Sequence, residues 1–160
     1  FLAPYKVIRI GIDKDLMGYR PEKGKKDKNG NLIEDREYNV LDFDKNIILE
    51  KRRKLVAKKI TEFLKKTDRF SKTIVFCVDT EHADAMRHYL INENSDLVAE
   101  NERYIMRITG NDEEGKRQLD YFISNNEKYP TIVTTSKLLT TGVDCKTCKL
   151  ISSINCINVW

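Results

Sequence analysis

Five hydroxyl side chains fall within eight residues of one segment: Thr134, Thr135, Ser136, Thr140 and Thr141. Hydroxyls and backbone N–H groups at the start of a helix bind phosphate without reading a base. Gly142 allows the backbone to approach a ligand closely, and Asp144 can accept hydrogen bonds from a sugar hydroxyl or an arginine. The segment from Thr134 to Asp144 therefore predicts a phosphate-directed site.

The elements that would position this segment alternate along the chain. Apolar runs predict strands over residues 73–78, 103–108 and 130–134, and a fourth strand beginning at 149. Helices are predicted between them, from a cap at Thr80 to about residue 92, and from residue 111 or 112 to 123. Strands separated by helices imply an α/β fold with right-handed β-α-β units and a parallel sheet. Because loops at the carboxyl ends of such strands share one edge, we expect residues 78–82 and 109–112 beside residues 134–144.

A helix predicted over residues 47–67 has two unlike faces. Its apolar face carries Leu49, Val56, Ile60, Phe63 and Leu64. The other faces carry Lys51, Arg52, Arg53, Lys54, Lys58, Lys59, Lys65 and Lys66. These charges either lie along nucleic-acid phosphates or form an ordinary solvated exterior, which is the commoner case.

The first 46 residues are predicted to form an extended arm or insertion with a hairpin, followed by a domain over residues 47–160. Residues 5–12 and 37–43 have strand composition, and Asn29-Gly30 between them is typical of a tight turn. Residues 1–72 hold 20 lysines and arginines against 12 acidic residues, whereas residues 73–160 hold 9 against 13. A basic half joined to a mildly acidic half suggests a polyanionic partner such as nucleic acid.

Composition excludes several classes of protein. With 34% charged residues, a mean hydropathy of −0.55 and no long apolar run, we expect no membrane partner. Four cysteines are too few for a disulfide scaffold, which favours a reducing cytoplasmic location. Cys145-x-x-Cys148 offers only two ligands, and His82 and His88 are distant in sequence, so we expect no metal site. The sequence does not begin with Met, and we expect it to be a piece of a longer chain.

At the hydroxyl-rich segment the sequence resembles a known family. Residues 132–144 resemble motif V of superfamily 2 helicases, residues 72–77 resemble motif IV, and Arg107-Ile108-Thr109-Gly110 resembles the element between them. Longer stretches over about residues 2–151 are similar to the motor (R) subunit of type I restriction enzymes. They include Asp35-Arg36-Glu37-Tyr38-Asn39, Leu55-Val56-Ala57-Lys58-Lys59-Ile60 and Thr67-Asp68-Arg69-Phe70.

The resemblance implies a three-layer α-β-α RecA-like lobe, the second of two, in an ATPase that pulls double-stranded DNA. It implies DNA-backbone contacts at Thr135 and Ser136, with Thr109 and Gly110 as weaker additions. It implies that Gly142 and Asp144 face the nucleotide. The implied partners are the N-terminal RecA-like lobe of the same parent chain and the modification and specificity subunits. ATP and Mg²⁺ would act in the complete subunit, with no cofactor tightly bound to this chain.

The sequence also departs from the family pattern. It has no G-x-x-x-x-G-K-[ST] phosphate loop and no acidic Mg²⁺ motif in the right context. Its last arginine is Arg117, so no residue can serve as the motif VI arginine. We therefore expect the chain alone neither to hydrolyse ATP nor to cut DNA. The alternative is a RecA-like module that binds nucleic acid or protein without chemistry.

Overall fold

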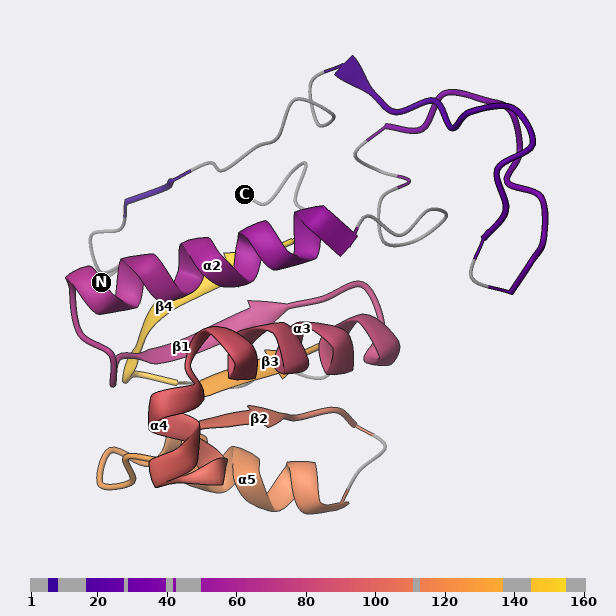
Figure 1. Cartoon of the computed structure of the whole chain (residues 1–160). Coiled ribbons are helices and arrows are strands. Elements are labelled where there is room, and N and C mark those ends of the chain that lie inside the picture. Colours follow the sequence, from indigo (N-terminus) through magenta and orange to yellow (C-terminus); the bar gives the residue numbers. More distant parts are fainter. Residues whose placement is uncertain are drawn as a thin grey trace. The chain divides into compact units, whose positions relative to one another are not determined.

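The structure contains two compact units, residues 1–48 and residues 49–160. It is a computed structural model, and it describes residues 6–8, 17–27, 29–39, 42, 50–110, 113–136 and 145–154. The second unit holds the four-stranded sheet (Figure 1).

In the first unit, Asp27 organises the predicted turn. Its carboxylate accepts hydrogen bonds from the backbone N–H of Asn29 at 2.8 Å and of Asn31 at 2.9 Å. The bond from Asn31 is the main cause that holds the pKa of the Asp27 carboxyl below its usual value. Gly30 has a φ of +83°, which glycine adopts without strain.

The two sides of this turn pair through isolated antiparallel bridges, Lys26 with Leu32 and Tyr19 with Tyr38. The prediction of a strand over residues 5–12 is wrong for residues 6–8, which have no regular secondary structure. All three are exposed, so no core is available there to stabilise a strand.

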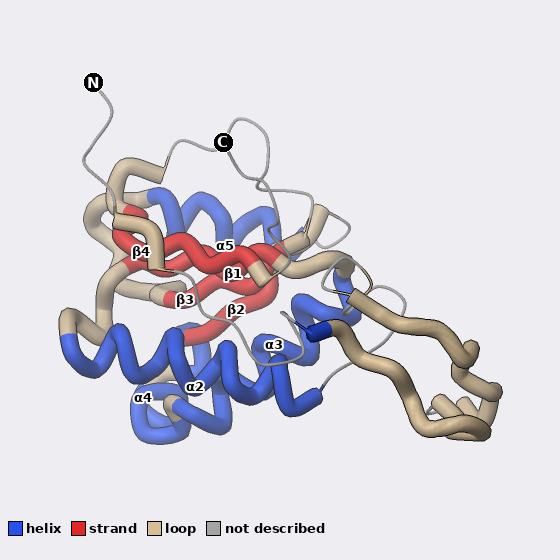
Figure 2. Tube along the Cα trace, turned by 90° about the horizontal axis from the view of Figure 1, so that it is seen from above, coloured by secondary structure: helices blue, strands red, loops and turns tan. Residues whose placement is uncertain are grey.

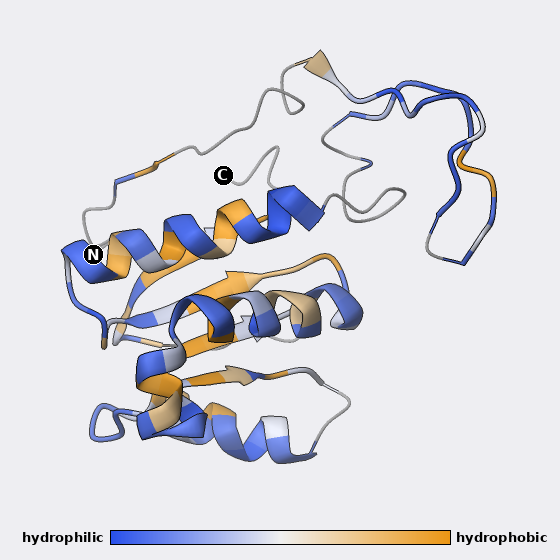
Figure 3. Ribbon diagram, in the orientation of Figure 1, coloured by the Kyte–Doolittle hydropathy of each residue, from blue (hydrophilic) through white to orange (hydrophobic). Residues whose placement is uncertain are grey.

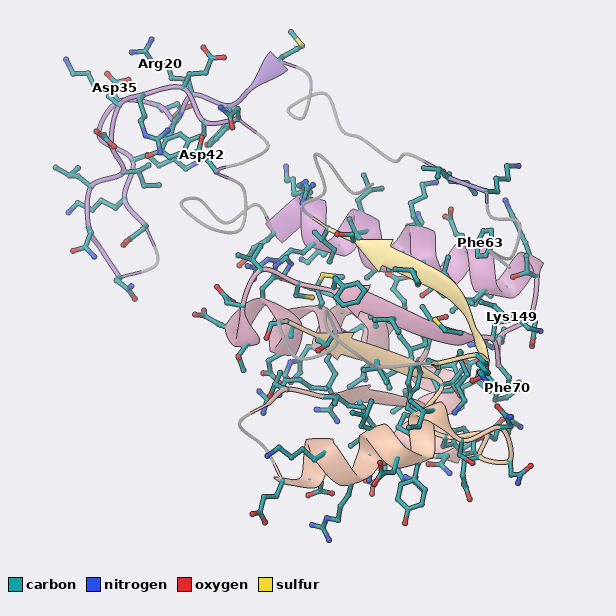
Figure 4. The ribbon with its side chains drawn as sticks, turned by 180° about the vertical axis from the view of Figure 1, so that it is seen from behind. Arg20, Asp35, Asp42, Phe63, Phe70 and Lys149 are labelled. Atoms are coloured by element: carbon teal, nitrogen blue, oxygen red, sulfur yellow. The ribbon has the colours of Figure 1, made fainter. Side chains whose placement is uncertain are left out.

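Ion pairs and a stacked ring support the same turn. Arg20 Nε lies 2.9 Å from the Asp35 carboxylate, and Arg36 lies 2.9 Å from the Asp42 carboxylate (Figure 4). The Arg36 guanidinium also stacks on the Tyr38 ring, 4.1 Å from its centroid. Tyr38 is 4% exposed, so its ring is buried within the described part of this unit.

The second unit is built on parallel strands. They are β1 (Lys72–Phe76), β2 (Ile105–Arg107), β3 (Ile132–Thr135) and β4 (Cys148–Ser153). Their order across the sheet is β2-β3-β1-β4, and every neighbouring pair is parallel. Strands β1 and β3 lie in the middle and are buried along nearly their whole length, as parallel strands with covered faces are.

Helices cover both faces of the sheet. They are α2 (Glu50–Lys66), α3 (Thr80–Glu93), α4 (Ser95–Glu100) and α5 (Glu113–Ile123), with a 3₁₀ turn η1 (Glu102–Tyr104) before β2. Viewed from above, the sheet separates α5 from α2, α3 and α4 (Figure 2). This three-layer arrangement confirms the predicted α/β, RecA-like fold class.

Each face of the sheet has its own apolar core. One cluster joins β1, β2 and β3 to the inner sides of α2 and α3, and includes Ala57, Leu64, Val75, Met86, Leu90, Tyr104 and Ile132. The other cluster lies under α5 and joins Ile74, Ile108, Phe122 and Val133. Hydrophobic bands on α2 and α5 alternate with hydrophilic ones in Figure 3, as expected for helices with one buried side.

Two local features differ from the sequence predictions. The short helix α4 was not expected; it follows Asn94, whose buried side chain donates to the Thr61 hydroxyl at 2.8 Å and to the Leu90 carbonyl at 2.9 Å. The cap of α3 is Asp79 and not Thr80, because the Asp79 carboxylate accepts from the His82 backbone N–H at 2.7 Å. Among the described residues, no helix is long and apolar enough to span a membrane.

Candidate functional site

The carboxyl ends of β1, β2 and β3 lie side by side, as predicted. The Cys77 N–H donates to the Thr135 carbonyl oxygen at 2.7 Å, and the Ile108 N–H donates to the Thr134 carbonyl oxygen at 2.9 Å. These bonds extend the sheet one residue past β1 and β2, so Thr109 and Gly110 follow directly beside Thr135 and Ser136. The structure therefore brings together the four residues predicted to contact DNA.

The two threonines that end β3 are buried and point to opposite faces. Thr135 lies on the α5 face with Val133, and Thr134 lies on the α3 face with Ile132, because side chains alternate along a strand. Both are 0% exposed. Neither hydroxyl has a hydrogen-bond partner within the part of the chain that the structure describes. Buried hydroxyls without partners are uncommon and mark this strand end as unusual.

The four predicted DNA-contact residues differ in exposure. Thr109 is 2% exposed and Thr135 is fully buried, whereas Gly110 is exposed and Ser136 is half-buried. The start of α5 packs closely on this edge at Gly115, where an added Cβ would lie 3.4 Å from the Thr109 backbone nitrogen. Solvent therefore reaches the edge at Gly110 and Ser136, while the two threonines lie beneath.

The residues predicted to face a nucleotide, Gly142 and Asp144, lie outside the described residues, as do Thr140 and Thr141. The described part of the segment ends at Ser136 and resumes at Cys145.

Asp79 and His82 are two polar residues at this edge that the sequence analysis did not assign to the site. The Val78 N–H donates to His82 Nδ1 at 3.3 Å, so this ring nitrogen acts as a hydrogen-bond acceptor. His82 is 0% exposed and His88 is exposed. An aspartate directly after a buried strand was the available signal for the cap.

A groove of about 350 Å³ lies apart from these hydroxyls, along the β2 side of the sheet. Three arginines and three carboxylates line it: Arg87, Arg103, Arg107, Asp84, Glu102 and Glu114. Arg107 lies 3.4 Å from Asp84, and the opposite charges balance across the groove. A second groove, about 340 Å³, lies at the amino edge, where Phe70 and Lys149 are close together (Figure 4). Neither groove adjoins the described hydroxyls of β3.

The described cysteines form no disulfide. Burial raises the pKa of the Cys148 thiol to about 11, so at neutral pH it is protonated. Within the described ranges, no group of three or more histidine, cysteine or carboxylate side chains is placed to hold a metal ion.

Comparison with known proteins places this geometry in a family. No family model matches the chain. The EcoAI endonuclease subunit of a type I restriction enzyme from Escherichia coli is 56% identical over 151 residues, which make up 94% of this chain and 19% of that protein. The EcoKI endonuclease subunit from Escherichia coli K12 is 34% identical over 119 residues, 72% of this chain and 10% of that protein. The chain belongs to the type I restriction enzyme R subunits.

A solved structure supports the same family. A fragment described as an HsdR subunit of a type I restriction enzyme from Vibrio vulnificus YJ016 superposes with a TM-score of 0.64 at 49% identity. The match covers 68% of this chain and 21% of that one. The chain thus spans about a fifth of the length of the EcoAI subunit and of the Vibrio fragment. The resemblance to R subunits inferred from the sequence is confirmed.

Proposed function

We propose that this chain is part of the second RecA-like lobe in the ATP-driven, DNA-translocating motor of a type I restriction enzyme R subunit. The observation that carries the proposal is the meeting of three strand ends, where Gly110 and Ser136 reach solvent above two buried threonines. Such an edge is where parallel α/β sheets bind their ligands. The 56% identity to an endonuclease subunit supports assigning this ligand edge to a restriction motor.

The proposed DNA contacts are directed to phosphates. The Ser136 hydroxyl and the Gly110 backbone N–H bind phosphate oxygens of the tracked strand, since both positions are accessible. Thr109 and Thr135 support them from beneath and orient the two loop backbones. None of these groups reads a base, so recognition of the target sequence belongs to the specificity subunit of the complex.

ATP is proposed to bind between this lobe and the N-terminal lobe of the same parent chain, with Gly142 and Asp144 facing it. The sequence has no G-x-x-x-x-G-K-[ST] phosphate loop and no acidic Mg²⁺ motif in the right context. We therefore assign the phosphate cradle and the Mg²⁺ ligands to the other lobe. This chain contributes only one wall of the cleft.

The proposal is tested in the complete subunit, assembled with its modification and specificity subunits. Replacing Ser136 with Ala together with Thr135→Val should lower DNA-stimulated ATP hydrolysis at least about tenfold, because phosphate contacts couple DNA to the motor. Ser95→Ala, an exposed serine that begins α4, is the matched control and should change the rate less than about twofold. Equal rates in the edge variant and the control would refute the assignment.

The alternative, a RecA-like binding module without chemistry, makes a different prediction for the parent. Its DNA binding would show no dependence on ATP turnover, and the edge variant would weaken binding alone. For the isolated chain, both proposals predict no ATP hydrolysis above background, and turnover by the purified chain would contradict both.

A further inference from the structure

Helix α2 has an outer face that is separate from the site described above. Its inner side is buried through Ala57, Ile60 and Leu64. The opposite side carries six lysines along its length: Lys51, Lys54, Lys58, Lys59, Lys65 and Lys66. Arg52 and Arg53, which share this helix, are buried, so the exposed positive charge of α2 comes from lysines alone.

Most of this charge is not neutralised locally. Lys59 pairs with Glu62 at 2.9 Å, and Lys54 lies over the Tyr89 ring at 5.8 Å from its centroid. The remaining four, Lys51, Lys58, Lys65 and Lys66, form no ion pair or hydrogen bond with any residue that the structure describes. The Glu62 carboxylate lies near them, and its pKa is lowered chiefly by the hydrogen bond from Lys59 and further by Lys58 and Lys66. The other carboxylate of the helix belongs to Glu50, an exposed residue at its start.

The other helices of the unit carry the opposite sign. Helix α2 has eight basic and two acidic residues, whereas α3, α4 and α5 together have three basic and eight acidic residues. A solvated exterior needs charge of either sign, and the neighbouring helices meet that need with a mild negative excess. The six lysines therefore exceed what solubility requires.

The chemistry of this face suits a polyphosphate better than a protein. Lysine is depleted at protein interfaces, whose centres are apolar and aromatic. On this face the apolar Leu55 is half-buried, and Phe63, at the side of the helix, is 36% exposed (Figure 4). Lysine is a flexible point charge that neutralises phosphates without base recognition.

The helix also starts at the edge where the proposed DNA contacts lie. The Arg52 guanidinium donates to the Ile154 carbonyl oxygen at 2.7 Å, and the Ile154 N–H donates to the carbonyl oxygen of Phe76, the last residue of β1. From Lys51 to Lys66 the helix rises about 22 Å, a length that covers roughly six phosphates of one B-form strand.

We propose that the outer lysine face of α2 is a second binding surface for double-stranded DNA, a sequence-independent phosphate track that leads away from the carboxyl edge. The inference rests on the proposed function, because DNA is taken as the motor's substrate. It adds a surface that holds the duplex by charge alone, at a distance from the hydroxyl site.

The test uses the 160-residue chain and a duplex of about 20 base pairs of arbitrary sequence, with affinity measured from about 50 to about 200 mM salt. One variant changes Lys51, Lys58, Lys65 and Lys66 to Gln. The matched control changes Lys23, Lys116, Arg117 and Lys149 to Gln, four exposed basic residues outside α2. Both variants lower the net charge by four, so they separate the position of charge from its amount.

The α2 variant should weaken binding at least about tenfold at low salt and reduce the slope of log K against log salt by about 3 to 4. The control should weaken binding less than about threefold. Equal losses in both variants, no loss in either, or equally effective competition by poly-glutamate would overturn the proposal.

A second measurement needs no variant and uses the complete subunit. Acetylation of the wild-type protein with and without DNA should show protection of Lys51, Lys58, Lys65 and Lys66, and none of Lys116 and Lys149. Unprotected α2 lysines would refute the track. If they are unprotected while the Ser136 and Thr135 variant still abolishes stimulation, only this inference fails; if stimulation survives that variant, the proposed function fails instead.

Discussion

The carboxyl edge of the sheet and the outer face of α2 are both polar, but they are built in opposite ways. At the edge, hydroxyls are buried at the ends of central strands and are fixed by backbone bonds such as that from Cys77 to Thr135. On the outer face of α2, most ammonium groups are exposed to solvent, and among the described residues only that of Lys59 pairs with a carboxylate, that of Glu62. The first arrangement fixes the positions of the hydroxyl groups, but burying polar groups lowers the stability of the fold. The second arrangement supplies positive charge with almost no loss of stability.

The inner and outer sides of α2 should contribute very differently to the free energy of unfolding. Leu64, 1% exposed on the inner side of α2, is expected to cost about 2–5 kcal/mol when changed to Ala, because a cavity forms between helix and sheet. On the outer side of the same helix, Lys58→Gln should change stability by less than about 0.5 kcal/mol. Urea unfolding followed by circular dichroism measures both. A large loss of stability from Lys58→Gln would show that the outer face helps to hold the fold together. It would contradict the comparison drawn above.

At the carboxyl edge, a smaller effect of unusual sign is expected. Thr134→Val keeps the shape and removes a buried hydroxyl that lacks a partner among the described residues, so stability should rise by up to about 1 kcal/mol. The matched control is Thr73→Val on β1, also 0% exposed, whose hydroxyl donates to the Ser71 carbonyl at 2.9 Å. That change should lower stability by about 1 kcal/mol. Identical shifts in midpoint would show that the Thr134 hydroxyl is satisfied after all.

The smallest effect concerns an exposed charge that does have a partner. Arg69 donates to the Asp96 carboxylate at 2.8 Å and holds the pKa of this carboxyl well below its ordinary 3.8. Its contribution is present above that ordinary pKa and is lost as the pH falls below it, because the unfolded chain then binds the proton first. The melting temperature of the wild type should therefore fall more between about pH 6 and about pH 3 than that of Asp96→Asn. An equal fall in melting temperature for the wild type and for Asp96→Asn would indicate that solvent screens the ion pair completely.

Much of the fold could be predicted because its elements carry their own signals. Periodic apolar residues indicated α2, α3 and α5, and β-branched runs indicated β1 and β3 to within two residues. Helix α4 was not predicted because its six residues make fewer than two helical turns, too few to show a helical period. It follows Asn94, whose side chain bonds back to Thr61, a tertiary contact that no local pattern encodes. For the α3 cap, adjacent Asp79 and Thr80 were both suitable residue types, and only the chain path decides between them.

The sequence predicted which residues meet at the candidate site, but it did not predict how buried each of them is. The rule that parallel strands share a carboxyl edge correctly brought Thr109, Gly110, Thr135 and Ser136 together. Exposure is a different matter, since a threonine has the same composition signal whether it faces water or the core. The burial of Thr135 follows from its place in a central strand under α5, which no local pattern encodes. Gly142 and Asp144 remain sequence predictions.

The strand order has a consequence for how the chain acquires its structure. Strand β2 pairs with β3 through Ile105 and Ile132, while the central strand β1 pairs through Thr73 with Ile132 on one side and with Leu150 on the other. Every strand thus pairs with a strand that is distant in sequence. The chain must lose loop-closure entropy before any strand pairing can stabilise it. A ribosome releases β1 first, and it has neither neighbour until β3 and β4 follow. Folding of this sheet is therefore expected to be slow compared with a helical domain of equal length, and its apolar central strand is the segment that a chaperone would meet.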